Sequence, residues 1–159
     1  MKKYVFPLII FLIIPIFSFT DEEEILKIDA SVVPKRLYRG QEGNLVLKLS
    51  LDNGINIMSQ PSFTIELSPS DELIFPKDFF TASDLGIEVT EENGKEYLNI
   101  EKPIEILFTV SLDVKQGNHT LEGRIKYFAS SKKENWCVKN ISNFSASFYT
   151  RSKAIKKSK

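Results

Sequence analysis

Apolar and polar residues alternate along most of this chain, and turn residues interrupt the alternation about every 8–12 positions. Every second residue of the segment 45–51 is leucine, and every second residue of 104–112 is apolar. A period of two is the pattern of a β-strand with one buried face. Further strands are expected at 25–33, 62–67, 72–75, 86–90, 96–100, 121–128 and 138–150.

The inward faces follow from the same alternation. Leu112 is expected to end the buried face of 104–112, and Tyr127 lies on the apolar face of 121–128. In 138–150 the apolar positions Ile141 and Phe144 are expected to face the core. Only 77–85 is ambiguous: it fits a short helix, but its Asp-Phe-Phe sequence better fits a packed loop.

Turn residues separate the expected strands. Asp52-Asn53-Gly54 follows the leucine strand, and Asn93-Gly94 lies between 86–90 and 96–100. Asn-Gly supplies the positive φ angles of tight turns, so the second pair predicts a hairpin. Eight or nine short strands without a helical period predict an all-β fold, an immunoglobulin-like two-sheet β-sandwich over residues 25–150.

The first 20 residues have the pattern of a secretory signal peptide. Lys2 and Lys3 precede an apolar run from Val5 to Phe17, and small residues follow near position 20. We expect an exported protein, periplasmic or secreted, with no membrane contact beyond this segment. Ser18-Phe19-Thr20 is a poor cleavage site, so an uncleaved N-terminal anchor remains the alternative.

Charge is balanced in total but polarised along the chain. The sequence has 21 basic and 21 acidic residues. An acidic run, Asp21-Glu22-Glu23-Glu24, follows the signal segment, and residues 151–159 form a basic C-terminal tail. Solvated tails are the plain interpretation. No basic cluster or motif within the central part indicates nucleic-acid binding.

Conventional catalytic and cofactor motifs are missing from the sequence. His119 is the only histidine and is expected on the surface at a strand start. The carboxylates of Asp71-Glu72 lie in an expected turn, where solvation is the plain interpretation. No metal-ligand spacing, phosphate loop or nucleophile elbow occurs, so we expect neither a cofactor nor a metal. Between an enzyme and a non-enzymatic protein, the sequence favours the second.

Cys137 is the only cysteine and follows the only tryptophan, Trp136. Exported proteins usually pair their cysteines, so a single one indicates a reactive thiol or an intermolecular disulfide. Lysines at 132, 133 and 139 would favour the thiolate. The alternative is a semi-buried residue that packs as a small hydrophobe.

Three stretches resemble a known family. They are Pro34-x-x-x-Tyr38-Arg39-Gly40-x-x-Gly43, then 52–61, and then Gly123 to Ser130 followed by Trp136-Cys137. Their order is similar to that in the N-terminal periplasmic domain of the thiol:disulfide interchange protein DsbD, the disulfide bond corrector domain family. The resemblance implies an immunoglobulin-like sandwich whose two cysteines form a reversible disulfide and exchange electrons with thioredoxin-like partners.

The resemblance places the second cysteine on Cys137 and the first on Ser130, or on Ser131. One sulfur cannot form an internal disulfide, so internal dithiol exchange is excluded, although a mixed disulfide remains chemically open. Three hypotheses follow. In the first, the chain is an exported protein-interaction domain that docks a thioredoxin-like or other exported protein through Tyr127, Ser130 and Trp136. In the second, it is a redox accessory protein in which Cys137 forms mixed disulfides or a disulfide-linked dimer. In the third, it is a surface or structural protein with an incidental cysteine.

Overall fold

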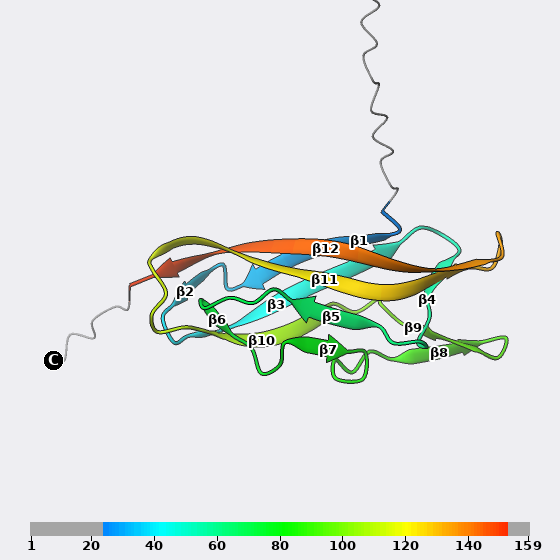
Figure 1. The fold of residues 1–159 in the computed structure, drawn as a ribbon, viewed down its shortest axis with the longest axis horizontal. Coiled ribbons are helices and arrows are strands. Elements are labelled where there is room, and N and C mark those ends of the chain that lie inside the picture. Colours follow the sequence, from blue (N-terminus) through cyan, green and yellow to red (C-terminus); the bar gives the residue numbers. More distant parts are fainter. Residues whose placement is uncertain (1–23, 153–159) are drawn as a thin grey trace, which may run out of the picture.

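The computed structural model describes residues 24–152, and the expected signal segment and most of the basic tail lie outside this range. The described residues form two sheets packed face to face and a small hairpin (Figure 1). The four-stranded sheet has the order β1-β3-β10-β6, with bounds Leu26–Val33, Glu42–Leu51, Ile104–Val110 and Leu73–Ile74.

The larger sheet has the order β2-β12-β11-β5-β7, and β4 also pairs with β11. We call it the six-stranded sheet. Its bounds are Arg36–Tyr38, Trp136–Arg151, Gly117–Ser131, Thr64–Leu67 and Phe79–Thr81, with Ile55–Ile57 for β4. Every pairing is antiparallel except that of β2 with β12. The remaining hairpin joins β8 (Val89–Glu92) to β9 (Lys95–Leu98).

The core lies between the two sheets and is built from the alternating residues of both. Leu45 and Leu47 of β3 are fully buried, and so is Ile125 of β11. Phe108 of β10 forms ring contacts with Phe148 of β12, at a centroid separation of 6.4 Å. Burial of these large side chains is the main favourable term in folding.

The expected fold class is confirmed: the described chain is an all-β, immunoglobulin-like sandwich. The expected hairpin at Asn93-Gly94 is also present, and both of its central residues have positive φ, 54° and 73°. None of the described residues is in a helix long and apolar enough to cross a membrane.

Three details of the strand prediction were wrong. Leu112 lies beyond the end of β10 and is 71% exposed, because the chain leaves the sheet after Val110. Ile141 faces outward and is 47% exposed, because β12 continues its alternation through Ser142 and Phe144. Segment 77–85 is neither a helix nor only a loop, because residues 79–81 pair with β5 as strand β7.

The two ends of β1 mark the two ends of the sandwich. Leu26 at its start pairs with Leu51, whereas Val33 at its end pairs with Asn44 and leads into β2. Strand β1 therefore begins toward the right of Figure 1, near the β11–β12 turn, and β12 ends at the left beside β2.

Candidate functional site

The long β11–β12 hairpin carries all four residues that the sequence singled out. Its register is continuous from Gly117↔Thr150 to Ser131↔Trp136, without a bulge. The turn at its tip uses Asn135 with φ of 54°, a conformation that asparagine tolerates. Residues on the two strands that oppose one another project to the same side of the sheet, so the register decides which candidates meet.

Ser130 and Cys137 are direct partners across this hairpin. The Cys137 side chain is exposed, and its Sγ lies 3.3 Å from Sδ of Met58. Ser130 Oγ is buried and has no hydrogen-bond partner among the described residues. The structure thus brings a serine hydroxyl, a thiol and a thioether together on the outer side of the six-stranded sheet.

Tyr127 belongs to the core and not to the surface. It is 1% exposed, and its hydroxyl hydrogen-bonds Ser142 Oγ at 3.1 Å. Burial raises the pKa of the Tyr127 hydroxyl above its ordinary value, against the opposing effect of the Ser142 hydrogen bond. Because a partner cannot reach this side chain, Tyr127 has no part in the docking surface proposed below.

Trp136 and the neighbouring lysines are held by local contacts. Trp136 Nε1 donates to Glu134 Oε2 at 2.8 Å, and the ring packs partly against the core. Lys132 forms an ion pair with Glu92 and lies over the Tyr97 ring, 5.1 Å from its centroid. Lys132 is therefore engaged with the β8–β9 hairpin and not with the Cys137 thiol.

The chemistry open to the hairpin is that of one thiol. A disulfide needs a second sulfur in the thiol state, and Met58 offers a thioether, which forms none. Among residues 24–152 no group of three or more histidine, cysteine or acidic side chains is placed to hold a metal ion. The remaining disulfide chemistry of Cys137 is attack of its thiolate on a disulfide of another molecule, which forms a mixed disulfide and releases the other sulfur as a thiolate.

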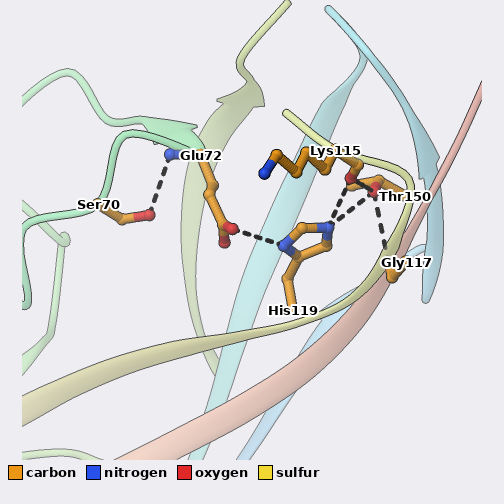
Figure 2. A network of polar contacts seen from close by, with 6 residues as sticks. All are labelled: Ser70, Glu72, Lys115, Gly117, His119 and Thr150. Carbon is orange, nitrogen blue, oxygen red and sulfur yellow. Dashed lines mark hydrogen bonds and ion pairs between the residues drawn. The ribbon is translucent and has the colours of Figure 1, made fainter. Parts of the chain in front are cut away.

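Sequence reasoning missed a polar network around His119 (Figure 2). The expectation of a surface histidine was wrong: its side chain is only 8% exposed. Figure 2 shows its ring between Glu72 on one side and Lys115 and Thr150 on the other. His119 Nδ1 lies 2.7 Å from Glu72 Oε1, and Nε2 lies 2.8 Å from both the Lys115 carbonyl oxygen and Thr150 Oγ1. The network joins the chain just before β6, the β10–β11 loop, the start of β11 and the end of β12.

Donor and acceptor roles in this network follow from chemistry. A backbone carbonyl only accepts hydrogen bonds, so Nε2 of His119 donates toward the Lys115 carbonyl oxygen. Thr150 Oγ1 lies 2.5 Å from the Lys115 carbonyl and donates to it, while accepting from Nε2. The imidazole also stacks on Phe148 at a centroid distance of 5.2 Å. These contacts hold the ring in place, so the arrangement is a structural clasp.

The outer side of the four-stranded sheet exposes apolar side chains close together. Val33 and Leu107 flank Asn44 in one row across β1, β3 and β10, and they are 53% and 52% exposed. Ile74 of β6 is 60% exposed. It pairs with Thr109, which lies two residues after Leu107 in β10. We call Val33, Leu107 and Ile74 the apolar patch. Acidic and basic side chains at its margin include Glu42, Glu105 and Lys48.

No family model matches the sequence, and no curated protein matches it. Solved structures of similar fold include the seventh ScaB type I cohesin of Pseudobacteroides cellulosolvens, at TM-score 0.45 and 16% identity, over 83% of this chain and 97% of that one. A cohesin module from a Clostridium perfringens family 33 glycoside hydrolase has TM-score 0.41 and 13% identity, over 80% and 96%. AggA, the major subunit of aggregative adherence fimbriae type I of Escherichia coli, has TM-score 0.38 and 11% identity, over 79% and 95%. These are similarities of fold at low identity.

The resemblance to the DsbD N-terminal domain was wrong. Neither a family model nor a curated protein supports the interchange-protein family, and the solved structures of similar fold include cohesin modules and fimbrial subunits. The residues that suggested it are explained by the sandwich itself. A Cβ on Gly123 would lie 2.4 Å from Cζ of Phe144, so close packing demands glycine there. Tyr127 is a core residue, and Gly40 has a φ of 72° in a turn.

Proposed function

We propose that this chain is an exported protein-interaction domain that docks its partner through the apolar patch on the outer side of the four-stranded sheet. The observation that carries the proposal is the exposure of three large aliphatic side chains, Val33, Leu107 and Ile74, on one outer side of the four-stranded sheet, where Asn44 of β3 separates Val33 from Leu107. Exposed apolar residues that gather in one place, with polar residues around them, are the usual anatomy of a protein interface.

The chemistry of the patch defines the partner it fits. Sheet pairing holds its backbone rigid, so binding costs little ordering of this chain. The interspersed Asn44 and Thr109 supply hydrogen-bonding groups, and Glu42, Glu105 and Lys48 lie at the margin. The matching partner is an exported protein with a flat aliphatic surface and charged residues of both signs at its rim. The N-terminal signal pattern of the sequence supports export.

Site-specific cross-linking tests this function. A photoreactive residue at position 107, in cells that naturally make the protein, is expected to give one discrete adduct with an exported protein. The same residue at Ser145, which is exposed on the other sheet, is the matched control and is expected to give none. Ile74→Asp is expected to abolish the adduct at 107 without lowering the melting temperature, since Ile74 is exposed. Equal adducts at 107 and 145, or none at 107, would overturn the proposal.

A second candidate function is favoured by the exposed Cys137. In this case the chain is a redox accessory protein that forms a mixed disulfide or a disulfide-linked dimer. Non-reducing electrophoresis of protein trapped with a thiol-blocking reagent tests it: a species of higher mass that is lost on reduction supports this role. Protein that migrates only as a monomer under those conditions rejects it.

A further inference from the structure

A basic groove lies on the outer side of the six-stranded sheet, at the end where β2 pairs with β12. Its volume is about 770 Å³, and its walls contain three cations, Lys35, Arg36 and Arg151. No carboxylate is among its lining residues, which otherwise include Tyr149, Asn118 and Gln116. The groove thus combines positive charge with neutral hydrogen-bonding groups.

Strand pairing fixes the positions of the groove residues. Tyr149 pairs with Asn118 on one side and with Arg36 on the other, so these three residues form one row across β11, β12 and β2. Arg151 pairs with Tyr38 in the next row on the same side of the sheet. Gln116 Nε2 donates to the Tyr149 hydroxyl at 3.4 Å. The charges are therefore anchored on regular strands, which favours a defined binding surface.

The positive charge of the groove is not neutralised within residues 24–152. None of Lys35, Arg36 and Arg151 forms an ion pair with a described carboxylate. Arg124 and Lys126 on the same sheet differ, because both bind Glu66 at 2.6 and 2.5 Å. The sequence after Ser152 adds four further lysines, at 153, 156, 157 and 159. An anionic ligand would neutralise the positive charge at this end of the molecule.

The opposite end of the same sandwich is acidic. Glu24, Asp52 and Glu134 line a hollow of about 330 Å³ beside Trp136 and outnumber the one lysine in its lining, Lys133. Asp52 also forms an ion pair with Lys27, at 2.9 Å. The sequence immediately before Glu24 is Asp21-Glu22-Glu23. Strand β12 runs from Trp136 at this end to Arg151 at the groove, which corresponds to roughly 50 Å of extended strand. The three residues before Glu24 reach at most about 11 Å, so the groove is beyond the reach of the acidic segment of its own chain.

We propose that the basic groove binds the acidic segment Asp21–Glu24 of a second copy of this chain, so that copies associate head to tail. Charge complementarity between the two ends of one molecule carries the proposal. Because the two surfaces differ, the contact is heterologous and leaves a free groove and a free acidic end on every pair, so it propagates into longer assemblies. The contact uses the six-stranded sheet and is independent of the apolar patch.

Sedimentation velocity of the full protein, purified from cells that export it, tests the proposal. Assemblies larger than a monomer are expected at low salt and are expected to dissociate at about 0.5 M salt, where screening acts over a few ångströms. Arg36→Glu with Arg151→Glu is expected to abolish assembly, and so is Glu22→Lys with Glu23→Lys. Lys95→Glu with Lys139→Glu changes the net charge equally on exposed strands away from the groove, and is expected to leave assembly intact.

The decisive measurement is a mixture of the two charge-reversed variants. Each variant alone is expected to be a monomer, whereas the mixture restores assembly, because every groove then meets a segment of opposite charge. A monomeric wild-type protein at low salt, or a mixture that fails to assemble, would overturn the proposal. So would a monomer whose Tyr149 and Asn118 resonances shift only with a sulfated polysaccharide, which would assign the groove to an anionic saccharide. If the apolar patch did not dock a partner, the cross-linking at position 107 would show it, and the head-to-tail assembly would be unchanged.

Discussion

Glu72 and His119 meet across two segments that are far apart in the sequence: Glu72 Oε1 lies 2.7 Å from Nδ1 of the buried imidazole. The second ring nitrogen is fixed by the Lys115 carbonyl and Thr150 Oγ1 (Figure 2). This clasp fastens the start of β11 and the end of β12 to the segment before β6. It holds the end of the sandwich at which the basic groove lies.

Replacement of His119 by alanine is expected to lower the free energy of unfolding by about 1–3 kcal/mol, because Thr150 and Glu72 lose buried hydrogen-bond partners. Urea unfolding monitored by Trp136 fluorescence measures the change. Glu88→Gln is the matched control: it removes an exposed ion pair to Lys102 and is expected to change the unfolding free energy by less than about 0.5 kcal/mol. Equal effects of the two substitutions would show that the clasp contributes no stability.

Gly123→Ala is expected to destabilise the fold by about 1–3 kcal/mol through overpacking. The added Cβ would lie 2.4 Å from Cζ of Phe144 and 2.8 Å from the Glu66 backbone oxygen. Thermal unfolding measures the loss, with Ser145→Ala on the adjacent strand as the control. Phe144→Leu in the Gly123→Ala background is expected to restore part of the stability by making room. A Gly123→Ala protein as stable as wild type would refute this packing.

Cys137 is expected to react with a thiol reagent in the folded protein, because its side chain is exposed. Mass spectrometry after a brief exposure should show one adduct, and denaturation should add none, since the sequence has a single cysteine. Cys137→Ser provides the blank. Labelling that appears only after denaturation would contradict the exposed placement and would also remove the redox candidate.

Ser130→Cys is expected to form a disulfide with Cys137. Tyr149 N–H bonds the Lys35 carbonyl on the side away from β11. Since the register has no bulge, the odd-numbered residues of β12, Cys137 included, also direct their backbone groups away from β11. Ser130 and Cys137 therefore form a non-hydrogen-bonded pair, whose Cα separation of about 4.5 Å permits a disulfide.

Oxidation of the Ser130→Cys protein, followed by counting of free thiols, measures this outcome. Ser145→Cys is the control, because its partner across the hairpin is Glu122 and not Cys137. Two free thiols in the oxidised Ser130→Cys protein would show that the hairpin register differs from the one described.

Asp84 is expected to titrate at an unusually low pH. The Lys77 ammonium, and then the Thr81 backbone N–H and hydroxyl, lower the pKa of the Asp84 carboxyl from 3.8 to about 2. A lowered pKa means that the carboxylate stabilises the folded chain above about pH 4, and that this contribution is lost as the pH falls toward about 2. The Asp84 side-chain resonance reports the midpoint directly. Thr81→Val is expected to raise it, whereas Thr90→Val, on the β8–β9 hairpin, is expected to leave it unchanged.

Most of the strands could be predicted because alternation is a local signal. A residue such as Leu47 is buried through its own place in a period of two, and Asn93-Gly94 specifies a turn through its own φ preferences. The prediction failed where the sequence carries no such signal. Ile141 is apolar yet faces outward, and residues 79–81 become a strand only because β5 offers a free edge.

The candidate site could be predicted only in part. The single thiol and its neighbour Trp136 are visible in the sequence, and Ser130 does pair with Cys137. The family resemblance failed because Gly123 and Tyr127, two of the residues that carried it, are required by packing within this sandwich. Burial of Tyr127 and the contact of Met58 with Cys137 depend on which strands become neighbours.

The sequence by itself determined the all-β class, the turns, the single thiol and the opposite charges of its two ends, since all of these are properties of short segments. Only the tertiary structure decided which side chains meet. It placed His119 against Glu72, gathered Val33, Leu107 and Ile74 on one outer side, and brought Lys35 and Arg36 beside Arg151. The physical reason is strand order: pairing between distant segments creates proximity that no local pattern encodes.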